Sequence, residues 1–251
     1  MIVSVWSTKG GTGTSTVALA LAQHLQRNKN GVALIDANLY SSTLTAMLGV
    51  EDTHYGLDRL FMYRETELLQ KAMKENWVKA EGFQLMPGMK FPPDDIDPVW
   101  AKKLAENIKG KESVIVDAGT SLLNPLQKEL LLRSDYIVVV VTPLIFTYHR
   151  LWEQWYHEFF VPHQLSRKTG VIINQHEGPV SPKDVATLMG VTLLGDLPHE
   201  KQLVQQMNLG NIRFSGKYLK KIAQAWGVLK KHAESSSTIV PSAQMRERPK
   251  E

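Results

Sequence analysis

The chain has 251 residues, of which 43% are hydrophobic and 22% charged, and it contains no cysteine. This length suits one large domain with a substantial core, or two small ones. The lack of cysteine excludes disulfides and thiolate-held metals, including iron–sulfur clusters. No apolar run approaches the ~18 residues that a membrane-spanning helix needs, and no signal peptide is evident. We therefore expect a cytoplasmic protein without direct membrane insertion.

The formal net charge is +4, and it is unevenly distributed. Between residues 201 and 232 there are seven basic residues and no acidic one. This asymmetry indicates either an anionic partner near the C-terminal end or a solvated helix face.

The first 22 residues predict a strand, a glycine-rich turn and a helix. Residues 2–6 form an apolar run typical of a buried strand, and residues 17–22 favour a helix. The turn between them, Ser-Thr-Lys-Gly-Gly-Thr-Gly-Thr-Ser-Thr, would direct backbone N–H groups and a helix N-terminus at one point. Such a turn suits a phosphate chain, which glycine allows to approach closely. The alternative is a glycine-rich turn without a ligand.

The turn fits the general phosphate-loop pattern G-x-x-x-x-G-K-[ST] only in part, because Thr8 replaces a glycine and Thr14 the lysine. It resembles more closely the deviant loop K-G-G-x-G-K-[ST]-[ST] of the ParA/MinD family of ATPases. That resemblance implies binding of ATP and Mg²⁺, with Lys9 reaching the partner's nucleotide across a homodimer, Ser15 binding Mg²⁺ and Thr16 a phosphate. The expected nucleotide-binding residues of the loop are Gly10, Gly11, Thr12, Gly13, Thr14, Ser15 and Thr16. The threonine at position 14 resembles the CpaE/TadZ branch, whose members position pilus assembly machinery.

Two predicted strands end in aspartate, Asp36 and Asp117. By the family resemblance, Asp36 lies near the Mg²⁺, Asp117 holds its water shell, and Gly119 approaches the γ-phosphate. Asn38 stands where the family has an aspartate that orients the attacking water. Because Asn38 is uncharged and Thr14 replaces a cation, we expect very slow or absent ATP hydrolysis.

Further apolar runs at residues 83–86, 136–141, 169–174 and 193–197 predict strands, and helical patterns separate them. The order predicts an α/β fold, a doubly wound and mostly parallel sheet with helices on both faces. The family resemblance implies that this fold is of the ParA/MinD P-loop NTPase type. We place a single nucleotide-binding domain at 1–232 and a disordered tail at 233–251.

The family resemblance implies that Asn174, at a strand end, reads the adenine base and that Pro198 lies in a loop near it. For Asn174, a residue that simply starts a turn is the alternative. An aromatic face predicts either core packing or a partner surface; it consists of Trp152, Trp155, Tyr156, Phe159 and Phe160 at helical spacing. Residues 217–232 predict an amphipathic helix with lysines on one side.

The sequence thus predicts a positioning protein in which ATP promotes a homodimer that recruits a protein cargo, such as pilus or secretion machinery. The first alternative is a DNA-partitioning ATPase whose basic C-terminal region binds DNA non-specifically. A metallocentre-maturation ATPase and a scaffold that binds no nucleotide are two further alternatives.

Overall fold

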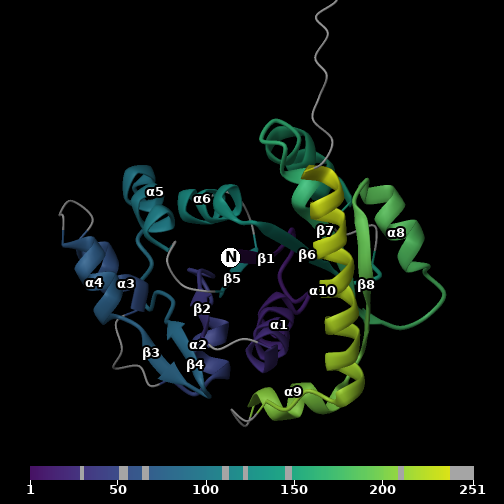
Figure 1. Cartoon of the computed structure of the whole chain (residues 1–251), viewed down its shortest axis with the longest axis horizontal. Helices are drawn as coiled ribbons and strands as arrows, with labels where there is room; N and C mark the ends of the chain where they lie inside the picture. The colour runs from purple at the N-terminus through teal and green to yellow at the C-terminus, as the bar shows by residue number, and fades with distance from the viewer. Residues whose placement is uncertain are drawn as a thin grey trace, which may run out of the picture.

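A computed structural model describes residues 1–28, 31–50, 56–63, 68–108, 113–120, 124–144, 149–208 and 212–237. Its centre is an eight-stranded sheet with helices on both faces, in the order β3-β4-β2-β5-β1-β6-β7-β8 (Figure 1). All neighbouring strands pair in parallel except β3 and β4, which are antiparallel at one edge. The predicted doubly wound, mostly parallel sheet is confirmed.

The inner strands are buried on both faces, which their runs of Val and Ile favour. The strands are β1 (Ile2–Ser7), β2 (Val32–Asp36), β3 (Val78–Ala80), β4 (Phe83–Met86), β5 (Ser113–Thr120), β6 (Tyr136–Val141), β7 (Thr169–His176) and β8 (Thr192–Pro198). Because parallel strands end at the same edge of the sheet, the segments that follow β1, β2, β4, β5, β7 and β8 gather there.

The helices form two layers, each with its own core. They are α1 (Thr14–Asn28), α2 (Thr43–Met47), α3 (Gly56–Met62), α4 (Leu69–Glu75), α5 (Pro98–Asn107), α6 (Pro125–Arg133), α7 (His149–Trp155), α8 (Pro182–Met189), α9 (Lys201–Asn208) and α10 (Gly216–Ser237). Successive residues of a strand face opposite sides, so Trp6 packs in the core under α5 to α8, and Val5 in the core under α1 and α10.

The predicted aromatic helix is interrupted. After α7 the chain forms a π-helical turn, η2 (Tyr156–Phe160), and a short 3₁₀ helix follows, η3 (Leu165–Lys168). Trp152 and Phe160 are nonetheless buried, with ring centroids 6.4 and 5.6 Å from that of Trp6. The core interpretation of this aromatic face is therefore confirmed for these two residues.

The last helix extends further than the sequence predicts. The predicted amphipathic helix ends at residue 232, whereas α10 continues to Ser237, five residues into the segment assigned to the tail. The rest of that predicted tail, 238–251, lies outside the described residues. No helix in the described part of the chain is long and apolar enough to cross a membrane.

Candidate nucleotide site

The glycine-rich turn lies where β1 meets α1, as predicted. Gly11 and Gly13 have φ of +78° and +88°, values that other residues rarely adopt. The Gly13 carbonyl accepts the N–H of Val17 at 2.9 Å and so begins the hydrogen bonding of α1. Lys9, Gly10 and Gly11 are exposed at the tip of the turn.

Thr14 occupies the place of the missing lysine with a short side chain that is 7% exposed. Its hydroxyl lies 3.2 Å from that of Thr12, within the turn. This position therefore supplies a neutral hydroxyl group where the general pattern supplies a cation.

Two buried carboxyl groups face each other behind the turn. Asp36 ends β2 and is paired in register with Asp117 on β5, and both are fully buried. One oxygen of Asp36 accepts the N–H and the hydroxyl of Thr45, each at 2.9 Å. One oxygen of Asp117 accepts the N–H of Gly119 at 3.0 Å, and the Ser15 hydroxyl also donates to this carboxylate.

The second oxygen of each carboxylate, Oδ1 of Asp36 and Oδ2 of Asp117, has no hydrogen-bond partner among the described residues. Burial raises the pKa of both groups well above the ordinary value for aspartate, and the Asp117 charge raises that of Asp36 further. Two adjacent buried carboxylates with open oxygens are energetically costly without a counter-charge, and they therefore favour a cation nearby.

Asn38 lies against the backbone of Gly119. A Cβ atom at Gly119, where φ is +59°, would come within 2.6 to 2.8 Å of the side-chain atoms of Asn38. The structure therefore brings Asn38, Asp36, Asp117 and Ser15 together behind one turn, although they come from three separate segments of the chain.

A cavity of about 220 Å³ opens beside the turn on the side of β7 and β8. Its lining comprises Gly11, Gly13, Thr16, Asn174, Gln175, Pro198, His199, Glu200, Leu203 and Tyr218. Asn174 and Pro198, both predicted near the base, line this cavity. Asn174 is 4% exposed and donates from Nδ2 to the carbonyl of Thr12 at 2.7 Å, so it contacts the turn directly.

Comparison with known proteins gives the fold a name. No curated protein matches the chain. A model of the ParA family, described as NUBPL iron-transfer P-loop NTPase, matches residues 1–81, which include the turn and Asp36.

Among solved structures, a plasmid partition protein from Borrelia burgdorferi bound to AMPPNP has 20% identity and a TM-score of 0.70 over 92% of this chain and 98% of its own. MinD of the MinC:MinD cell division complex from Aquifex aeolicus has 20% identity and a TM-score of 0.72 over 91% and 95%. MinD from Pyrococcus horikoshii, complexed with Mg-ADP, has 20% identity and a TM-score of 0.71 over 95% and 99%. The fold is that of the ParA/MinD P-loop NTPases.

On this ParA/MinD fold, the chemistry of the oxygen donors fits Mg²⁺. Ser15, Asp117 and Asp36 offer only hard oxygen atoms, and two of these atoms are unpartnered in the described chain. Mg²⁺ keeps several waters and is commonly held by one or two carboxylates together with phosphate oxygens. The protein would supply few of the metal ligands, and accordingly the described residues contain no group of three or more His, Cys, Asp and Glu side chains suited to a metal.

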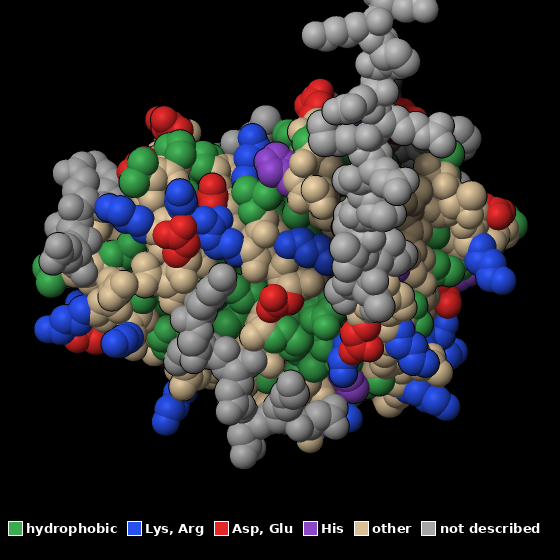
Figure 2. Space-filling view, turned by 45° about the horizontal axis from the view of Figure 1, so that its top comes forward, with side chains coloured by type: hydrophobic (Ala, Val, Ile, Leu, Met, Phe, Trp, Pro, Cys, Tyr) green, Lys and Arg blue, Asp and Glu red, His purple; other side chains and the backbone are tan. Residues whose placement is uncertain are grey.

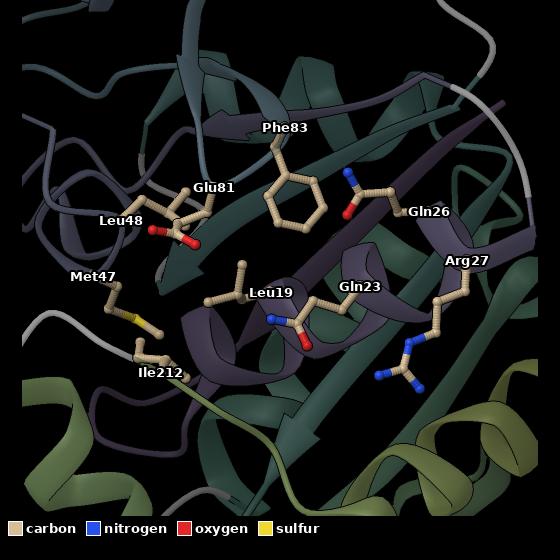
Figure 3. Close-up of a pocket in the computed structure, with 9 residues that line it drawn as sticks. All are labelled: Leu19, Gln23, Gln26, Arg27, Met47, Leu48, Glu81, Phe83 and Ile212. Carbon is tan, nitrogen blue, oxygen red and sulfur yellow. The ribbon is translucent and has the colours of Figure 1, made fainter.

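A second cavity, of about 310 Å³, lies elsewhere in the described part of the chain (Figure 3). It is lined by α1, α2, the β3–β4 turn and Ile212, and Figure 3 shows Glu81 and Arg27 on opposite sides of Leu19 and Phe83. None of the predicted site residues lines it.

Sequence reasoning missed several residues of the nucleotide site. Thr45, which holds Asp36, lies in a short helix without a motif. Tyr218 and Glu200 line the cavity from α10 and from the segment after β8. Tyr218 belongs to no recognisable motif in the sequence of the last helix, because only the tertiary fold brings it to the end of β7.

Proposed function

We propose that the protein binds ATP with Mg²⁺, forms a homodimer in that state, and in that form recruits a protein cargo. The observation that carries the proposal is the pair of open carboxylate oxygens of Asp36 and Asp117 beside Ser15. They lie directly behind a turn whose glycines Gly11 and Gly13 have positive φ and which leads into the N-terminus of α1. This combination supports binding of a phosphate chain together with a divalent cation.

The backbone N–H groups of residues 9–15 and the N-terminus of α1 would hold the phosphates. Ser15 and Asp117 would hold Mg²⁺, in part through water, with Asp36 nearby. Mg²⁺ would supply neutralisation of phosphate charge. Thr16 would add a hydroxyl group to a phosphate, and Asn174 and Pro198 would border the base.

Hydrolysis would be very slow or absent. It requires stabilisation of the charge on the γ-phosphoryl group and a water held in line for attack. Thr14 contributes no cation, and its hydroxyl is already near that of Thr12. Asn38 lies at Gly119, at the place where an anionic acceptor would be needed, and provides an amide.

Lys9 supports dimerisation. Its side chain is exposed and has no ion-pair partner within the described part of the chain, although the turn that carries it is otherwise tightly folded. A nucleotide enclosed between two subunits needs cationic neutralisation, because the interface has a low dielectric constant. With Thr14 neutral, Lys9 and Mg²⁺ would provide more of that charge.

Calorimetry and sedimentation with ATP and Mg²⁺ test the proposal. We expect binding at or below millimolar ATP and conversion of monomer to a long-lived dimer. Lys9→Ala should abolish the dimer but keep monomeric ATP affinity within about tenfold, or about 1.4 kcal/mol. Lys183→Ala, on the exposed surface of α8, is the matched control and should dimerise normally.

Two results would contradict it. Absence of heat at millimolar ATP, with folded protein, would leave the nucleotide-free scaffold as the better interpretation. Dimerisation of Lys9→Ala with ATP would show that a nucleotide sandwich is not the mechanism.

The cargo we propose is pilus or secretion machinery, because Thr14 resembles the CpaE/TadZ branch. Capture of such components by the dimer and not by the Lys9→Ala monomer is the test.

A second candidate function, non-specific DNA binding, is favoured by α10. Lys217, Lys220, Lys230 and Lys231 are exposed on this helix, whereas Lys221 is paired with Asp196 at 2.6 Å. On the face shown in Figure 2, Lys and Arg side chains are interspersed with Asp and Glu. An ATP-dependent gel shift with random DNA that weakens with salt, and is lost when Lys220 and Lys231 are changed to Glu, would support this function.

A further inference from the structure

Asn174 connects the phosphate-binding turn to the C-terminal helix. Its Nδ2 donates to the carbonyl of Thr12 at 2.7 Å, and its Oδ1 accepts the hydroxyl of Tyr218 at 3.4 Å. Asn174 is 4% exposed and Tyr218 1% exposed. The bonds join the end of β7 to residues 162 positions before it and 44 positions after it in the chain.

The amide of Asn174 is packed tightly against the turn. A Cβ atom on Gly13 would lie 2.2 Å from Nδ2 of Asn174, so only glycine fits at that position. A primary amide has two N–H donors and one oxygen acceptor. Here one N–H is bonded to the turn and the oxygen is bonded to Tyr218, which fixes the orientation of the amide.

Tyr218 is itself held in place at the start of α10. Its ring stacks on Phe214, with centroids 5.3 Å apart and planes 21° apart. Its N–H donates to the Ser215 hydroxyl at 3.1 Å, and that hydroxyl donates to the carboxylate of Glu200. Glu200 lines the cavity beside the turn, so the first turn of α10 is attached to both sides of the site.

We infer that Asn174 is a positioning residue that fixes the conformation of the phosphate-binding turn, and that Tyr218 fixes the position of Asn174. Phosphate binding is then coupled to the packing of the first turn of α10 against the site. The inference rests on the proposed function, namely that the turn binds a nucleoside triphosphate. A turn that is ordered before binding loses less conformational freedom when the phosphates arrive, which raises affinity. Such coupling is reciprocal. Contacts that fix the position of α10 would strengthen phosphate binding, and bound phosphate would in turn stabilise the position of α10.

Inorganic tripolyphosphate with Mg²⁺ is the probe, because it has phosphates but neither sugar nor base. We expect Asn174→Ala to weaken the binding of both ATP and tripolyphosphate by about tenfold or more, as measured by calorimetry. Tyr218→Phe, which keeps the ring and removes the hydroxyl, should weaken the binding of both ligands by the same factor, and by less than Asn174→Ala does. Thermal unfolding verifies that each variant is folded, and Tyr218→Phe decides the matter if Asn174→Ala does not fold.

Each variant has a matched control. Asn76 is also buried and donates its amide to a carbonyl, that of Gly56, at 2.6 Å, but it lies at the β3 edge of the sheet. Tyr136 packs on α10 through Trp226, with centroids 5.2 Å apart, away from the turn. Asn76→Ala and Tyr136→Phe should leave the affinity for both ligands within about twofold of the parent, since neither side chain contacts the site.

Hydrogen exchange provides a readout that does not depend on affinity. Tripolyphosphate should slow amide exchange in the first turn of α10 in the parent and in Tyr136→Phe, but not in Tyr218→Phe. If Asn174→Ala loses ATP affinity and keeps that for tripolyphosphate, Asn174 reads the base instead, and the inference is overturned while the proposed function stands. If the parent binds neither ligand, the proposed function fails and the inference fails with it.

Discussion

A single side chain, Thr14, separates this glycine-rich turn from the deviant loop that carries a lysine at that position. The backbone features that hold phosphate are present: positive φ at Gly11 and Gly13, and a helix that begins at Thr14. Phosphate binding depends mainly on these N–H groups, whereas transfer of the phosphoryl group depends on cationic charge. The two requirements can therefore be separated by mutation.

We expect Thr14→Lys to raise the rate of phosphate release from ATP by at least about tenfold, because a cation stabilises charge on the γ-phosphoryl group. Thr14→Ser, which keeps the hydroxyl near Thr12, is the control and should leave the rate unchanged. A steady-state phosphate assay on pure protein measures it. A parent rate near one per second would show that the turn needs no lysine and that the proposed slow hydrolysis is wrong.

The carboxylate pair predicts a pH dependence for the metal-free protein. Burial and the neighbouring charge raise the folded-state pKa of Asp36, so the protonated form favours folding. Its contribution to stability is fully present below the ordinary aspartate pKa and is lost as pH rises through the raised value. Asp36→Asn removes the charge, and its free energy of unfolding should exceed that of the parent by a margin that grows as pH increases.

Denaturant unfolding with a metal chelator, between pH 5 and pH 8, measures this margin, at about 1.4 kcal/mol for each unit of pKa shift. Asp95→Asn, at an exposed position, is the control and should not diverge from the parent. A constant margin across this range would mean that Asp36 ionises normally in the folded protein.

At the scale of elements, the side chain of Lys168 caps the C-terminal end of α6, although the two are far apart in the sequence. Its ammonium donates to the carbonyls of Leu132 and Ser134 at the C-terminal end of that helix, the first at 3.0 Å. Burial lowers the pKa of Lys168, while the negative end of the helix dipole and Asp135 favour its charged form. The 3₁₀ helix η3, which precedes β7, is thereby attached to the start of β6.

We expect Lys168→Met to lower the free energy of unfolding by about 1–3 kcal/mol, because it leaves two carbonyls at the helix end without a donor. Lys183→Met, on the exposed face of α8, is the control and should stay within about 0.5 kcal/mol. Denaturant unfolding compares the two. Equal effects would show that the contacts of Lys168 add nothing to stability.

At the scale of the whole molecule, two large exposed side chains follow strands that end at the edge of the sheet carrying the candidate site. Tyr40 is 71% exposed and follows β2, and Phe91 is 77% exposed and follows β4. Both strands end at the edge that carries the turn, and hydrogen bonds from Ser42 to the carbonyl of Met89 and from Gly88 to Thr45 join the two segments. Exposed apolar side chains at the same edge of the sheet as the exposed Lys9 fit contact with a second copy of the chain.

Phe91→Ser should therefore weaken the ATP-dependent dimer by about tenfold or more while leaving ATP binding to the monomer unchanged. Leu188→Ser is the control: Leu188 is 47% exposed, near the end of α8, which leads back to the opposite edge of the sheet. Sedimentation over a range of protein concentrations gives both dimer constants. If Phe91→Ser dimerises as the parent does, the second copy docks elsewhere.

Local sequence determined much of this protein. Apolar runs identified the strands, glycine identified the turn, and aspartate at strand ends identified Asp36 and Asp117, because all of these signals depend on residues close together in the chain. The fold class followed from the alternation of strands and helices. The spacing of Trp152, Trp155, Tyr156, Phe159 and Phe160 predicted an aromatic helix face, but it decided neither between core and partner surface nor the π-helical turn.

Tertiary structure alone decided how these parts meet. The register of β2 against β5 places Asp36 beside Asp117, so the pKa of Asp36, raised by burial, is raised further by the neighbouring charge. The strand order brings Asn174 to Thr12 and Tyr218 across 162 and 44 positions. Hydrogen bonds between such distant residues leave no periodic trace in the sequence, because each depends on the order in which the strands assemble.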